Sequence, residues 1–115
     1  MASKVLIGAK DDVVKTIRLY LLTKALISDI RFFIIDISET DYEEDERTYF
    51  KTKDVAIAIE AIDRHFDSMA RYSEAGITLY VTLNNKQIPV YYRNTVRSGV
   101  YREFYNESRD FLRHK

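Results

Sequence analysis

The sequence predicts a two-layer α/β domain, with two helices against one face of a mixed four-stranded sheet and a further helix at the C-terminus. Three observations support this prediction. Some stretches repeat apolar residues at spacings of three and four, as amphipathic helices do, and others alternate apolar and polar residues, as half-buried strands do. The stretches follow one another in the order β-α-β-α-β-β-α, which two packed layers accommodate. The length of 115 residues fits a single domain.

The first strand is expected at Lys4–Ala9 and the first helix directly after it. The strand carries a short apolar run that ends at Gly8, and Asp11 or Asp12 then caps the helix, as short acidic side chains do at helix N-termini. The apolar stripe of this helix consists of Val14, Ile17, Leu21 and Ala25. Its basic residues fall largely elsewhere, which predicts one buried side and one solvent-facing side.

A second strand and an acidic segment follow. The strand is expected at Ile30–Ile37, because its apolar run Phe32–Ile35 lacks alternation, as in a strand that is covered on both faces or central in its sheet. The segment Glu39–Glu46 holds six acidic residues and no basic one, and we expect it to be an exposed loop. A solvated connection is the simplest interpretation of this loop, and a partner-binding or self-shielding role is the alternative.

The second helix is expected at residues 54–67. Its apolar residues at helical spacing are Val55, Ala58, Ile59, Ile62 and Phe66. A β-hairpin then covers residues 76–92, with alternating residues on both strands and the turn Asn84-Asn85-Lys86 between them. Pro89 lies inside the returning strand and cannot donate to a ladder, so it favours an edge or a bulge. Beyond Gly99, apolar spacing predicts a C-terminal helix.

The composition excludes several kinds of site. There is no cysteine, which excludes a disulfide framework, a thiolate metal site and a cysteine nucleophile. No apolar stretch is long enough for a signal peptide or a membrane span, which predicts a cytoplasmic protein with no membrane contact. Abundant charge with one glutamine and no cysteine is compatible with a thermophilic source.

The charged residues are numerous but balanced. The net charge is zero, with 18 basic and 18 acidic residues, whereas nucleic-acid-binding domains usually carry a basic excess. Six of the acids are confined to Glu39–Glu46, so the rest of the chain has a net charge of +6. This segregation leaves room for a basic surface.

The sequence offers little for catalysis or metal binding. It has no phosphate-binding glycine loop, no dinucleotide-binding motif and no H-E-x-x-H zinc motif, and its three glycines are far apart. His65 has acidic neighbours at Asp63 and Asp67, yet residues two apart on a helix point away from each other. We therefore expect no enzyme activity, no metal site and no cofactor. A small enzyme centred on His65 is the least favoured alternative.

Tyrosine is frequent towards the C-terminus and is interleaved there with arginine. The residues concerned are Tyr91, Tyr92, Tyr101 and Tyr105 with Arg93, Arg97 and Arg102. Tyrosine that stacks on bases, beside arginine that contacts phosphates, is typical of proteins that hold single strands. The alternative is that Tyr92, Tyr101 and Tyr105 are core or dimer-interface residues with the arginines at the rim.

The order of elements and several short motifs resemble the Alba family of small archaeal chromatin proteins. Val5–Lys10 resembles the opening strand of that family and the turn after it, and Ile59–Phe66 resembles the end of its second helix. The hairpin Ile77–Arg93 corresponds to the arm of that family. The resemblance implies a homodimer in which Lys10 contacts DNA, Phe66 packs between dimers, and the hairpin reaches along the minor groove.

Together these observations predict a non-catalytic homodimer that binds DNA or RNA, built as one domain over residues 1–115 with a helical extension at about 99–115. The expected nucleic-acid contacts are Lys10, Lys15, Arg18, Lys86 and Arg93. The expected dimer-interface residues are Phe66, Tyr91, Phe104 and Phe111, because so short a chain carries surplus apolar surface. The alternative function is that of a viral or mobile-element accessory protein, which binds a protein partner through residues 39–46 and the tyrosine-rich C-terminal region.

Overall fold

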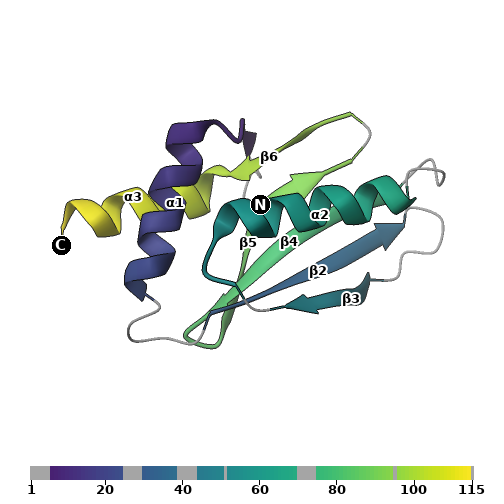
Figure 1. Ribbon diagram of the computed structural model, residues 1–115, viewed down its shortest axis with the longest axis horizontal. Coiled ribbons are helices and arrows are strands. Elements are labelled where there is room, and N and C mark those ends of the chain that lie inside the picture. Colours follow the sequence, from purple (N-terminus) through teal and green to yellow (C-terminus); the bar gives the residue numbers. More distant parts are fainter. Residues whose placement is uncertain are drawn as a thin grey trace.

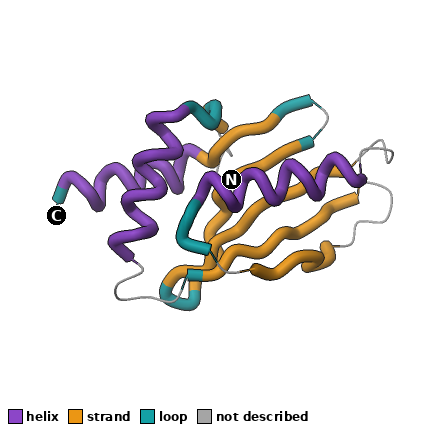
Figure 2. Tube along the Cα trace, viewed as in Figure 1, coloured by secondary structure: helices purple, strands orange, loops and turns teal. Residues whose placement is uncertain are grey.

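The computed structural model describes residues 6–24, 30–38, 44–50, 52–69, 75–94 and 96–114. In these residues the chain forms a six-stranded sheet and three helices (Figures 1 and 2). The elements are β1 (Leu6–Ile7), α1 (Asp11–Lys24), β2 (Arg31–Ser38), β3 (Glu44–Phe50), α2 (Val55–Met69), β4 (Ala75–Leu83), β5 (Lys86–Arg93), β6 (Ser98–Tyr101) and α3 (Arg102–Arg113). The strand order is β1-β6-β5-β4-β2-β3, and each pair of neighbours is antiparallel.

The α/β class is confirmed, but the sheet is larger than the four strands expected and is antiparallel instead of mixed. A parallel pair would arise if β1 and β2, which α1 connects, were neighbours in the sheet. Instead β1 lies at one edge beside β6, and β2 lies near the other edge between β4 and β3. The two strands that were not predicted, β3 and β6, account for the difference.

β3 occupies part of the segment that was expected to be an acidic loop. Glu44–Glu46 pair with Ile35–Ile37 of β2, so the loop prediction is wrong for these three residues. Residues 39–43, the rest of the predicted loop, lie outside the described residues. β3 is an edge strand, and charged residues are common on such strands because they oppose pairing with another chain. The acidic run therefore contains a strand that its composition concealed.

β6 takes the place of the expected start of the C-terminal helix. The helix was expected beyond Gly99, whereas α3 begins at Arg102, and Tyr101 before it is extended, with φ −68° and ψ 128°. Gly99 belongs to β6, and a Cβ atom added there would lie 2.5 Å from the carbonyl oxygen of Ile7. Glycine is therefore needed at this position for β1 and β6 to lie so close together.

The β4–β5 hairpin is confirmed, with its turn at Asn84 and Asn85. These residues have positive φ angles of 52° and 65°, as a type I′ turn requires, and asparagine adopts such angles more readily than most residues. The pairing register shifts between Leu79 and Tyr80, which leaves an extra residue on β5 next to Pro89. Pro89 thus lies at a β-bulge, one of the two places expected for a proline inside a strand.

The helices cover one face of the sheet. α2 packs on β4 and β5, α3 packs on β5 and β6, and α1 packs on α3 and α2. Figure 1 shows α2 crossing in front of the strands, with α1 and α3 crossing at one end of the molecule. The buried side chains between the helices and this face form one core, which includes Ile17, Phe32, Val55, Leu79 and Phe104.

Tyr20 links α1 to α3 within this core. Its side chain is only 1% exposed, and its ring meets those of Phe104 and Phe111 edge-on at centroid distances of 5.8 and 5.3 Å. Its hydroxyl donates a hydrogen bond to Glu107 at 3.3 Å. Burial, and then the nearby Glu107 carboxylate, raises the pKa of Tyr20 to about 12, because both disfavour a tyrosinate.

We expect Tyr20 to make the fold less stable in alkaline solution. The unfolded chain releases this proton above about pH 10 while the folded chain keeps it, so rising pH favours unfolding, by about 1.4 kcal/mol from this group at about pH 11. Below about pH 10 the Tyr20 hydroxyl is protonated in both the folded and the unfolded state, so its titration does not lower the free energy of unfolding there. Urea unfolding at about pH 9 and 11 tests this, since Tyr20→Phe should lose less stability between the two than the wild type. An equal loss in both proteins would contradict it.

Candidate nucleic-acid interface

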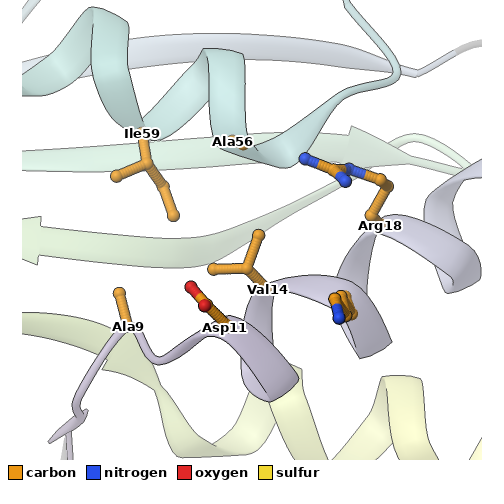
Figure 3. Close-up of a pocket in the computed structure, with 7 residues that line it drawn as sticks. Ala9, Asp11, Val14, Arg18, Ala56 and Ile59 are labelled. Carbon is orange, nitrogen blue, oxygen red and sulfur yellow. The ribbon is translucent and has the colours of Figure 1, made fainter.

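A cleft of about 280 Å³ lies between α1 and α2 (Figure 3). Its lining residues are Ala9, Asp11, Val14, Lys15, Arg18, Ala56 and Ile59. Figure 3 shows Val14 and Ile59 pointing towards each other from the two helices. The cleft thus has apolar walls, and it brings together two of the predicted nucleic-acid contacts, Lys15 and Arg18.

The turn after β1 places Lys10 beside this cleft. The backbone amide of Lys10 donates to the carbonyl of Gly8 at 2.9 Å, and the amide of Val14 donates to the carbonyl of Lys10 at 2.9 Å, which begins α1. Lys10 therefore holds the N-cap position, one residue before the predicted Asp11, while the Asp12 side chain accepts a hydrogen bond from the first-turn amide of Val13 at 3.0 Å, as a capping aspartate does. Both aspartates lie in the first turn of the helix, where negative charge is favourable. Lys10 is exposed and directly precedes Asp11, which lines the cleft.

Asp54 joins the start of α2 to the middle of α1. Its Oδ1 atom accepts a hydrogen bond from the amide of Ala56 at 2.9 Å, which caps α2. The same atom lies 3.1 Å from Nη2 of Arg18 and accepts a hydrogen bond from its Nε at 3.2 Å. Arg18 is therefore partly neutralised, and Lys53, which precedes Asp54, is brought close to α1.

Lys15 lines the cleft, Lys10 directly precedes the lining residue Asp11, and Lys53 directly precedes Asp54, which binds Arg18. All three lysines are exposed, and we refer to them as the basic edge. Among the ion pairs of the described residues, none involves a lysine of the basic edge. Lys53 was not predicted as a contact. Its sequence signal is the pair of basic residues in Lys51-Thr52-Lys53, but its place beside α1 depends on the Arg18–Asp54 contact, which spans 36 residues.

Lys86 and Arg93, the other two predicted contacts, do not belong to this surface. They lie at opposite ends of β5, about 23 Å apart for an extended strand of this length. Arg93 is held within the chain, with Nη1 2.9 Å from Asp63 and Nη2 3.4 Å from Asp67. Its guanidinium also lies 4.7 Å from the centre of the Phe66 ring. Arg93 therefore links β5 to α2, and the carboxylates of Asp63 and Asp67 compensate its positive charge.

The predicted dimer-interface residues are mostly internal. Phe66 and Tyr91 are 5% exposed and Phe104 is 0% exposed within one chain, so these three do not supply the surplus apolar surface from which the interface was predicted. Tyr91 also donates a hydrogen bond to Asp63 at 3.2 Å. Phe111 is half-buried and packs against Tyr20. The large apolar side chains that the described residues leave exposed are Leu19, Leu22, Ile57 and Val96.

The interleaved tyrosines and arginines are divided among several places. Tyr91 and Arg93 face α2, whereas Tyr92 and Tyr101 lie on the opposite face of the sheet. On that face Tyr80 stacks on Phe33, with ring centroids 5.3 Å apart and planes inclined by 13°. Phe33 is only 2% exposed and Tyr101 only 7%, so these rings offer little surface for stacking with bases. For Tyr101 the core interpretation is therefore the better one.

The described residues give His65 no metal site. No group of three histidine, cysteine or acidic side chains that could hold a metal ion occurs among them, and Asp63 is occupied by Tyr91 and Arg93. Across the same parts of the chain, no helix is long and apolar enough to cross a membrane.

No protein-family model, no curated protein and no solved structure matches the chain. The resemblance to Alba proteins therefore stays a prediction, and the geometry of the cleft and its charged residues is the basis for a proposed function.

Proposed function

We propose that the chain binds nucleic acid, without catalysis, by contacting phosphates through the basic edge. The observation that supports this is that Lys15 lines the cleft while Lys10 and Lys53 adjoin Asp11 and Asp54 in the chain, and that all three are exposed and outside the ion pairs of the described residues. An uncompensated lysine in water is suited to a phosphate, which it binds as a point charge. Lys10 is also the residue that the Alba resemblance assigns to DNA contact.

The length of this surface suits a nucleic-acid strand. From Lys10 to Arg18 the helix rises about 12 Å, at 1.5 Å per residue. One strand of a duplex carries a phosphate about every 3.4 Å along its axis, so the surface matches about three or four phosphates.

Salt dependence is the direct test of this proposal. With three phosphate contacts, the logarithm of the affinity should fall against the logarithm of the salt concentration with a slope of about −2.7 for duplex DNA and about −2.1 for a single strand. Duplex affinity should therefore drop about 40-fold between about 50 and 200 mM salt. Fluorescence anisotropy with labelled DNA and RNA measures this slope. Binding that does not change with salt, or no binding to either polymer, would contradict the proposal.

The protein-interaction alternative has less support from the geometry. It combined residues 39–46 with the tyrosine-rich C-terminal region. Within the described part of the chain, Glu44–Glu46 belong to edge strand β3, while Tyr91 lies in the core and Tyr105 lies on α3. These elements do not form one surface. The homodimer stays a prediction, which the mass of the protein in solution tests.

A further inference from the structure

We infer that the cleft between α1 and α2 receives one unpaired base, so that the polymer bound at the basic edge is single-stranded at this point. This inference rests on the proposed function and adds the class of nucleic acid to it. It depends on three properties of the cleft, namely its size and walls, the charges at its opening, and the carboxylate of Asp11 inside it.

The size and walls of the cleft suit one ring system. Its volume of about 280 Å³ lies just below the range of about 300–1,000 Å³ that is usual for sites of whole ligands. Val14 and Ile59 approach from opposite sides, so a planar ring between them would be covered on both faces (Figure 3). A base in a duplex is paired and stacked, and it reaches such a cleft only when it is unpaired or flipped out.

The charges at the opening suit the phosphates next to such a base. Lys15 lines the cleft and is exposed, and Arg18 lines it with one side of its guanidinium on Asp54. Lys10 precedes the lining residue Asp11. A ring bearing a phosphate on either side is therefore complementary to an apolar cleft with cations around it, which is how single-strand sites combine base and backbone contacts.

Asp11 gives the cleft a preference among bases. Its carboxylate lines the cleft, and no hydrogen bond to it occurs among the described residues. An ionised carboxylate only accepts hydrogen bonds, so it favours the exocyclic amino group of cytosine and repels the carbonyl oxygen that thymine or uracil has at that position. We therefore expect oligo(dC) to bind about fivefold more tightly than oligo(dT).

The test compares Ala56→Leu with the wild type on single-stranded and duplex DNA of equal length. Ala56 lines the cleft, and leucine there fills it without changing the charge. The wild type should prefer single strands, and Ala56→Leu should lower single-strand affinity about tenfold, because the base can no longer bury its ring between the apolar walls of the cleft, while duplex affinity and the salt slope stay the same. Ala61→Leu is the matched control, because Ala61 is a half-buried residue of α2 outside the cleft lining.

Asp11→Asn tests the base preference separately. The asparagine amide can donate to thymine, so the ratio of oligo(dC) to oligo(dT) affinity should fall towards one. The ratio is the informative quantity, because loss of a negative charge raises affinity for both oligonucleotides. Salt-dependent binding with no single-strand preference, or an Ala56→Leu effect equal on both forms, would overturn this inference and leave the proposed function standing. Absence of salt-dependent binding by the wild type would overturn both.

Discussion

Replacing Lys10, Lys15 and Lys53 together with alanine should lower affinity for duplex DNA about 500-fold at about 0.1 M salt. Each phosphate contact contributes about 0.9 logarithmic units at that concentration, which is about eightfold, and three contacts multiply. The salt slope should fall from about −2.7 to near zero in the same variant. All three side chains are exposed and outside the ion pairs of the described residues, so thermal stability should not change measurably.

The control for this triple variant is Lys86→Ala. Lys86 is an exposed lysine at the β4–β5 turn and lies outside the cleft lining. Its replacement removes one positive charge but should leave both affinity and salt slope close to the wild-type values. The single variants Lys10→Ala, Lys15→Ala and Lys53→Ala complete the comparison. If Lys86→Ala lowered the affinity as much as each of them, overall charge and not this surface would determine binding.

Phe104→Ala should destabilise the fold by about 3–5 kcal/mol, as expected for a fully buried phenylalanine. Its side chain is 0% exposed, and its ring packs edge-on against Tyr20. At roughly 4 °C per kcal/mol for a domain of this size, the melting temperature should fall by about 12–20 °C. Phe111→Ala is the comparison, because Phe111 packs on the same tyrosine but is half-buried, and its loss should be clearly smaller.

This experiment also separates a core residue from an interface residue. If Phe104 belonged to a dimer interface, its replacement would halve the mass in solution and leave the unfolding of the single chain nearly unchanged. Light scattering and thermal melting on the same samples distinguish the two outcomes. A halved mass with an unchanged melting temperature would restore the interface prediction for Phe104.

The parts of the fold that the sequence predicted are those in which local pattern and final environment agree. The β4–β5 hairpin has strict alternation and two asparagines at its turn, and both features act within a few residues. β3 was missed because an edge strand can be as highly charged as a loop, and the acidic composition of Glu44–Glu46 is typical of a loop. β6 was missed because Ser98–Tyr101 is short and runs directly into α3.

The sequence predicted the residues of the candidate site only where local sequence alone determines their place in the fold. Lys10 and Lys15 follow from a strand that leads into a helix. For Arg93 the sequence shows the charge but not the ion pairs with Asp63 and Asp67, which lie 30 and 26 residues earlier in the chain, so its role as a nucleic-acid contact stays a prediction. Lys53 was missed for the related reason that long-range contacts decide its neighbours.

The pairing of β1 with β6 has a consequence for how the chain folds. Leu6 pairs with Tyr101, so this contact joins residues that are 95 positions apart. Contacts of such sequence separation carry a large loop-closure cost and form late, whereas the β4–β5 hairpin closes locally. During synthesis the first strand therefore has no partner in the sheet until β6 has left the ribosome. Removal of the last 18 residues, from Ser98 onwards, would leave Leu6 and Ile7 with no neighbouring strand and α1 without α3.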